Sequence, residues 1–215
     1  MPEDTHNTRP LGRRDRKRLE TRSGLAAVAL ELFAERGFDA VTVSDIADRA
    51  DVDPSTFFRH FGSKQAVIFS DFDDAVTRLG DAVRAQPADL SLLETMRAGL
   101  KNLSAMLMVD LNEQRRRGEL ILSTPSVRAQ ALVVREALID ELTLAIAERM
   151  AVDPVHDSRP YLLAAAYVLA GTWYREYAVK TGTLPGSSDE GVNRIIELIE
   201  GFVAVFAEAP PQRPR

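Results

Sequence analysis

The sequence of 215 residues contains no cysteine, which excludes disulfides, thiolate metal sites and cysteine nucleophiles. It has no apolar run near the roughly 20 residues that span a bilayer, and its N-terminus lacks the apolar core of a signal peptide. No stretch has a glycine-rich phosphate loop or the spacing of metal ligands. We therefore expect a cytoplasmic protein that has no metal or cofactor and no membrane contact.

Catalytic signatures are also missing. The three histidines, His6, His60 and His156, are scattered and form no catalytic set, and no nucleophile motif accompanies them. We therefore expect that the protein is not an enzyme. Convincing period-two alternation is absent as well, whereas apolar residues recur at helical spacing through most of the chain. The expected fold class is all-α, and 45% hydrophobic residues are ample for a buried core.

The charge is unevenly distributed. A net charge of −5 argues against general affinity for nucleic acid. However, seven basic residues and only two acidic ones lie between Arg9 and Arg22. The expected helix from Arg13 to Arg36 carries most of this cluster near its N-terminus, where cations oppose the helix dipole. A phosphate partner would remove that conflict, and a solvated charged tail is the alternative.

The stretch from Thr42 to Lys64 has the pattern of a helix-turn-helix. Thr42 and Asp45 have the spacing of a capping box. Asp53 is suited to cap a second helix whose first residue is Pro54, and Gly62 is suited to end it. Two short helices so closely joined must cross steeply, as in DNA-reading motifs. The residues expected to pack between them are Ile46, Ala47, Val52, Phe57 and Phe61.

The rest of the chain is predicted to be helical. Ser63 is expected to cap a helix that begins near Lys64. Further helical patterns extend to Pro87, from Leu92 to Leu122 with a break, from Pro125 to Met150, from Tyr161 to Lys180 and from Val192 to Ala207. The predicted organisation is a disordered arm (1–12), a helix-turn-helix domain (13–63), a second helical domain (64–209) and a tail (210–215).

These residues resemble the TetR family of bacterial transcriptional regulators. The resemblance covers roughly Arg13 to Phe72. It is carried by Leu32 to Phe38, Thr42-Val43, Ile46-Ala47, Ala50, Val52, Thr56-Phe57-Phe58, His60-Phe61 and Ser63-Lys64. Arg59 and Asp71-Phe72-Asp73 are similar to a subgroup that includes mycofactocin and acyl-CoA-responsive regulators. The resemblance implies a homodimer on a palindromic operator of double-stranded DNA, with an effector site and the dimer contacts in the C-terminal domain.

The resemblance also implies DNA-binding roles. Arg59 is the best candidate for a base contact, since its guanidinium can hold guanine with two hydrogen bonds; a phosphate contact is its alternative. His60 has a purely structural alternative. Phe58 replaces the family's usual tyrosine and therefore lacks a hydroxyl for phosphate. The base-edge candidates are Ser44, Pro54, Ser55, Thr56 and Arg59; the phosphate candidates are Thr42, Phe58, His60 and Lys64, with Arg13, Arg14 and Lys17 from the basic cluster.

The C-terminal half gives two further sets of candidates. Phe72, Met96, Leu100, Met106, Leu111, Trp173 and Tyr177 are expected to line a site for a small lipophilic or aromatic effector, with ordinary core packing as the alternative. Val168, Thr172, Val192, Ile195, Ile199, Phe202 and Phe206 are expected to form the dimer interface. The leading interpretation is a ligand-released repressor. The alternative is a DNA-anchored interaction protein or activator that binds no small molecule.

Overall fold

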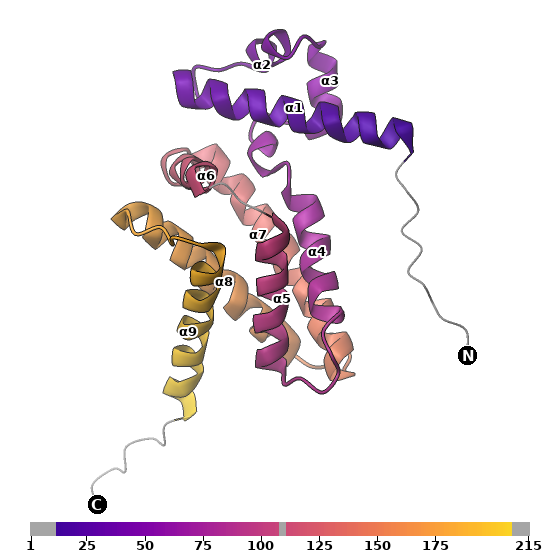
Figure 1. The fold of residues 1–215 in the computed structure, drawn as a ribbon, viewed down its shortest axis with the longest axis vertical. Helices are drawn as coiled ribbons and strands as arrows, with labels where there is room; N and C mark the ends of the chain where they lie inside the picture. Colours follow the sequence, from indigo (N-terminus) through magenta and orange to yellow (C-terminus); the bar gives the residue numbers. More distant parts are fainter. Residues whose placement is uncertain (1–11, 108–110, 208–215) are drawn as a thin grey trace, which may run out of the picture. The chain divides into compact units, whose positions relative to one another are not determined.

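The computed structural model describes residues 12–107 and 111–207, and these residues form helices without any strand (Figure 1). The all-α prediction is confirmed. The chain divides into two compact units between Ser70 and Asp71, here called the N-terminal unit and the C-terminal unit. None of the helices within the described ranges is long and apolar enough to cross a membrane.

The N-terminal unit contains α1 (Arg13–Arg36), α2 (Val43–Arg49), α3 (Pro54–Phe61) and the short 3₁₀ helix η1 (Ala66–Phe69). Its helix ends follow the local sequence. Gly37 and Gly62 have φ of 81° and 71° after α1 and α3, a region that glycine enters without steric cost. Thr42 and Asp53 cap α2 and α3 through their side chains. The predicted boundaries of these three helices are confirmed.

The helix predicted to begin at Lys64 is wrong. The Ser63 hydroxyl does accept a hydrogen bond from the Ala66 amide at 3.2 Å, but a turn and η1 follow, and α4 begins only at Phe72. The physical reason lies in three consecutive buried residues, Val67, Ile68 and Phe69. One face of a regular amphipathic α-helix cannot bury three residues in succession, so this segment is enclosed on more than one side and does not follow the one-sided helical pattern expected from the sequence.

Within residues 71–107 and 111–207, the C-terminal unit is a bundle of six helices. They are α4 (Phe72–Arg84), α5 (Leu92–Leu107), α6 (Leu111–Ser123), α7 (Pro125–Met150), α8 (Arg159–Thr181) and α9 (Ser188–Ala207). One apolar core joins α4, α5, α7, α8 and α9 and includes Met96, Leu142, Ile146, Ala164 and Ile199. Burial of such aliphatic side chains is the main force that holds the bundle together.

The contact of α4 with α7 is unusually close. A Cβ atom on Gly80 would lie 2.1 Å from Oε1 of Glu141, so the absence of a side chain there leaves room for the glutamate. Arg84, one turn further along α4, donates hydrogen bonds to Glu141 and Glu148 of α7, both at 2.7 Å. This ion-pair network fixes the C-terminal end of α4 against α7.

The end of α7 provides a stability prediction. Ala151 caps this helix with φ of 53°, a left-handed conformation that costs an L-residue roughly 1–2 kcal/mol. We expect Ala151→Gly to raise the free energy of unfolding by about 0.5–1 kcal/mol, less than the strain because glycine gains entropy in the unfolded chain. Gly182, which caps α8 at φ 70°, is the matched control, since Gly182→Ala should be destabilising. Thermal unfolding of both variants measures these changes. A stability change of the same sign in the two variants would contradict the prediction.

Candidate nucleic-acid interface

Helix α3 has one buried and one exposed side. Phe57 and Phe61 are buried, with ring centroids 5.1 Å apart, and they fix the helix in the N-terminal unit. Ser55, Phe58 and Arg59 are exposed on the same helix. A short helix anchored by two aromatic rings therefore presents a hydroxyl, an aromatic ring and a guanidinium outward.

The start of α3 is fixed by its cap. Asp53 accepts a hydrogen bond from the Ser55 amide at 2.8 Å, and its hydrogen bonds from Ser55 lower the pKa of the Asp53 carboxyl. Pro54 occupies the first helical position, where a backbone donor would have no helical partner. The backbone at the N-terminal end of α3 is thus held in place while the Ser55 hydroxyl remains at the surface.

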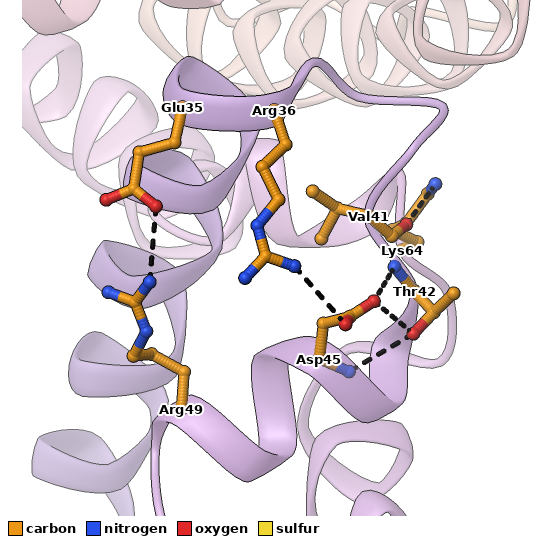
Figure 2. A network of polar contacts seen from close by, with 7 residues as sticks. All are labelled: Glu35, Arg36, Val41, Thr42, Asp45, Arg49 and Lys64. Carbon is orange, nitrogen blue, oxygen red and sulfur yellow. Dashed lines mark hydrogen bonds and ion pairs between the residues drawn. The ribbon is translucent and has the colours of Figure 1, made fainter.

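Helix α2 is held by its own cap and by two ion pairs from α1 (Figure 2). The Thr42 hydroxyl accepts from the Asp45 amide, and the Thr42 amide donates to the Asp45 carboxylate at 2.7 Å. The Thr42 hydroxyl also donates to the Asp45 carboxylate at 2.5 Å. The hydrogen bonds from the Thr42 hydroxyl and amide lower the pKa of Asp45, with a smaller contribution from Arg36, whose guanidinium lies 3.4 Å from the carboxylate. Arg49 donates to Glu35 at 3.2 Å. Both ion pairs are exposed, so each contributes little to stability.

The structure places most of the predicted DNA-binding residues at the surface of this unit. Thr42, Ser44, Ser55, Phe58 and Arg59 are exposed, and Pro54, Thr56 and His60 are half-buried. The Arg59 guanidinium donates to the Thr56 hydroxyl at 3.3 Å, and Phe58 packs edge-on against Phe57. On the N-terminal part of α1, Arg13, Arg14 and Lys17 are exposed.

Two cations of the unit are engaged inside it. Lys64 donates to the backbone carbonyls of Phe38 and Val41, and Arg22 donates to the carbonyls of His60 and Ser70. The sequence interpretation assigned Lys64 to a DNA phosphate and counted Arg22 in the basic cluster. It missed these bonds because backbone carbonyls distant in sequence leave no residue pattern.

His60 provides a pH prediction. Burial lowers the pKa of its imidazole, and the nearby charges of Arg59, Arg22 and Arg18 lower it further. The unfolded chain therefore binds more protons than the folded unit below the ordinary pKa of about 6.5. The contribution of neutral His60 to the free energy of unfolding should be fully present above about pH 6.5. It should decrease as the pH falls from about 6.5 towards the lower pKa of the folded protein.

Replacing His60 with glutamine removes this titration. We expect thermal unfolding of His60→Gln to vary less between about pH 5 and 7 than that of the wild type. Identical pH profiles for wild type and His60→Gln would contradict the prediction.

Comparison with known proteins identifies the family of the chain. A family model described as bacterial regulatory proteins of the tetR family matches residues 25–70, and the model of the MftR C-terminal domain matches residues 90–188. The transcriptional regulator TcmR of Streptomyces glaucescens is 31% identical over 186 residues, which cover 80% of this chain and 82% of TcmR. The chain belongs to the TetR family of bacterial transcriptional regulators.

Other TetR-family proteins agree with this assignment. The putative mycofactocin biosynthesis regulator MftR of Mycobacterium tuberculosis is 31% identical over 119 residues, covering 55% of this chain and 60% of MftR. Thermus thermophilus FadR, a repressor solved with lauroyl-CoA, superimposes with a TM-score of 0.58 at 20% identity, covering 90% of this chain and 99% of that one. At that identity the likeness shows the fold alone. The predicted family and its helix-turn-helix are confirmed, and the MftR match supports the narrower resemblance.

In the C-terminal unit of this TetR-family chain, the predicted effector-site residues whose side chains the structure describes lie in different environments. Met96 is fully buried in the core and Phe72 is half-buried. Trp173 and Tyr177 stack at 5.2 Å on the outer side of α8 and are about half exposed. They line an open groove of about 380 Å³ with Tyr174, Arg194, Glu197 and Leu198. The side chains of Leu100, Met106 and Leu111 lie outside the described residues.

The predicted dimer residues include some that are buried within the protomer and some that are exposed. Val168, Val192 and Ile199 are buried in the protomer itself, and Ile195 packs against its core. Thr172 is half-buried, with its hydroxyl donating to the Val168 carbonyl, and Phe202 is exposed. The side chain of Phe206 lies outside the described residues. Helical spacing identified α8 and α9 as apolar, but it did not separate their inner side from their outer side.

Proposed function

We propose that this protein is a dimeric repressor that binds a palindromic DNA operator and is released from it by a small lipophilic or aromatic effector. The observation that carries the proposal is the geometry of α3. Buried Phe57 and Phe61 fix it, a side-chain cap holds its start, and Ser55, Phe58 and Arg59 point outward. A helix presented in this way fits the major groove, where base edges are distinguishable.

The contacts divide into base reading and phosphate binding. Arg59 reads a base, because its planar guanidinium can donate two parallel hydrogen bonds to guanine. Exposed Arg13, Arg14 and Lys17 on α1 supply the local positive charge that a chain of net charge −5 otherwise lacks. Ser44, Pro54, Ser55 and Thr56 approach base edges; Thr42, Phe58 and His60 lie along the phosphate backbone. The Thr42 contact has to form beside a hydroxyl and an amide already engaged by Asp45.

The dimer is proposed to form through the outer side of α8 and the exposed part of α9. Leu162, Leu169 and Trp173 follow one another at seven- and four-residue steps and are all exposed, so they share one side of the helix. Exposed Tyr161 and Phe202 add to the apolar area of these two helices. A patch of this kind marks an interaction surface. Pairing α8 and α9 with their copies gives a four-helix bundle about a two-fold axis.

The symmetry of the dimer determines the form of the DNA site. Two copies of α3 related by a two-fold axis read the same sequence on opposite strands, so the operator must be palindromic. The half-sites are expected about one helical turn apart, roughly 34–36 Å.

An effector inside the C-terminal unit is supported by polar groups in its interior. The hydroxyls of Thr95 and Tyr167 are buried and have no hydrogen-bond partner within the described ranges. Burial raises the pKa of Tyr167 to about 12, so the phenol remains a donor at neutral pH. Buried hydroxyls are normally paired, and an apolar ligand with an acceptor group would supply such a partner. FadR, which has the same fold, binds the amphiphile lauroyl-CoA.

Two experiments in sequence test the proposal. Selection of bound duplexes from a random pool should recover a palindrome, and an unbiased pool after selection would refute operator binding. The protein bound to the recovered duplex is then titrated with lauroyl-CoA and with uncharged aromatic compounds. Release at micromolar concentration supports an effector-released repressor. Retention across all these compounds favours the alternative, a DNA-anchored interaction protein or activator without a small ligand.

A further inference from the structure

Lys64 occupies an internal site built from one turn of the N-terminal unit. Its ammonium donates to the carbonyl oxygen of Val41 at 2.7 Å (Figure 2). It also donates to the carbonyl oxygen of Phe38 at 2.7 Å and lies 4.2 Å from the centroid of the Phe38 ring. An ammonium has three N–H donors, so two are already used within the protein. The Phe38 ring adds a cation–π contact on a third side.

The two carbonyls that accept from Lys64 lie next to the start of α2. Phe38 and Val41 lie in the turn between α1 and α2, and Val41 directly precedes Thr42, the N-cap of α2. Lys64 therefore connects the chain after α3 to the start of α2. Through this connection, the entry to the helix-turn-helix and the exit from it are held at a fixed separation.

Arg22 makes the corresponding contact at the end of α3. Its guanidinium donates to the carbonyl of His60, in the last turn of α3, and to the carbonyl of Ser70 at 3.0 Å. It also lies 4.8 Å above the ring of Phe61. Arg22 is thus a second internal cation, and unlike Lys64 it belongs to α1. It fixes the C-terminal end of α3 and the residue that follows η1, again through backbone carbonyls and an aromatic ring.

We propose that Lys64 and Arg22 are positioning residues that set the orientation of α2 and α3 in the major groove, and that neither is a phosphate contact. This inference rests on the proposed DNA-binding function and assigns part of its sequence discrimination to these two internal cations. Base reading depends on placing side chains such as Arg59 against base edges, whereas phosphate attraction depends mainly on the number of exposed charges.

Lys64→Met and Lys17→Met form a matched pair, because the same substitution removes an internal and an exposed ammonium. Affinity is measured for the selected palindrome and for a scrambled duplex of equal length and composition, across a salt series and well below the unfolding temperature. Lys64→Met should lose about tenfold in affinity for the palindrome, the size of one base contact. Its affinity for the scrambled duplex and its salt slope should remain those of the wild type.

Lys17→Met should show the reverse pattern. Each lost phosphate contact lowers the slope of log affinity against log salt concentration by about 0.9 in magnitude. A dimer that loses two such contacts should therefore show a slope smaller by roughly 2 on both duplexes, and it should keep its preference for the palindrome. If Lys64→Met instead lowers the slope as Lys17→Met does and keeps the preference, Lys64 is a phosphate contact and the proposal is overturned. An equal loss on both duplexes at constant slope would show a purely structural role and would also overturn it.

Amine acetylation of the wild-type protein tests the same point without any variant. Lys64 should react slowly in the free protein and no more slowly with DNA, whereas Lys17 should react readily and become protected by the palindrome. Ready acetylation of Lys64 in the free protein, lost only on DNA binding, would overturn the proposal. Failure of the DNA-binding function itself is distinguishable, since no palindrome would be recovered and Lys17 would gain no protection.

Discussion

Replacing Leu169 with glutamate is expected to convert the proposed dimer into a monomer and to lower the affinity for the proposed operator by about 100-fold or more, the range that linkage of two binding sites provides. Leu169 lies on the proposed dimer surface of α8 and is 47% exposed, so the protomer tolerates a charge there. In the dimer, the two-fold axis brings both glutamates into an apolar interface, where unpaired charges are costly.

Leu144 provides a matched control for this prediction. It is also a leucine within a helix, lies on α7 and is 48% exposed, but it is not part of the proposed dimer surface. Sedimentation velocity should give a monomer for Leu169→Glu and a dimer for Leu144→Glu, and fluorescence anisotropy should show weak operator binding only for the first. A dimeric Leu169→Glu protein with wild-type affinity would refute this interface.

Replacing Arg59 with alanine is expected to weaken binding to the palindrome by at least about tenfold, since each protomer loses roughly 1–3 kcal/mol of base discrimination. The side chain is exposed on α3 and donates a 3.3 Å hydrogen bond to the Thr56 hydroxyl. Its removal should therefore leave folding nearly unchanged, and thermal unfolding checks this.

The alternative role of Arg59 predicts a different pattern of loss. A phosphate contact would weaken binding to all duplexes by the same factor and lower the salt slope. A base contact instead weakens binding to the palindrome more than to its scrambled form. Arg59→Lys is informative beside the alanine variant, because lysine keeps the charge and loses the planar pair of donors. A base-reading arginine predicts that lysine restores the general affinity but not the preference.

The helix-turn-helix could be predicted from sequence because its determinants are local. Thr42 and Asp53 cap helices through atoms two or three residues away, and Gly62 ends α3 through its own backbone conformation. None of these effects depends on distant parts of the chain. The same local reasoning failed at Lys64, because Val67, Ile68 and Phe69 are all buried in a 3₁₀ turn and do not follow the one-sided pattern of the predicted helix.

The C-terminal residues were harder to assign for a physical reason. Apolar spacing shows that Val168 and Ile199 face something apolar, but a protomer core and a dimer partner are equally apolar. The structure buries both in the core of one chain. Trp173 and Tyr177 were expected in an effector site, and they stack on the exposed side of α8. Which side of a helix meets its own chain depends on how the helices of the whole unit pack against one another.

The central claim is that α3 reads the operator through Arg59, once in each half-site. Selection from a random duplex pool, run in parallel with the wild type and Arg59→Ala, tests it most directly. The wild type should recover a palindrome, and the variant should recover the same palindrome with one preferred guanine lost at the symmetry-related position of each half. Identical consensus sequences from the two proteins would contradict the claim, as would a wild-type consensus without two-fold symmetry.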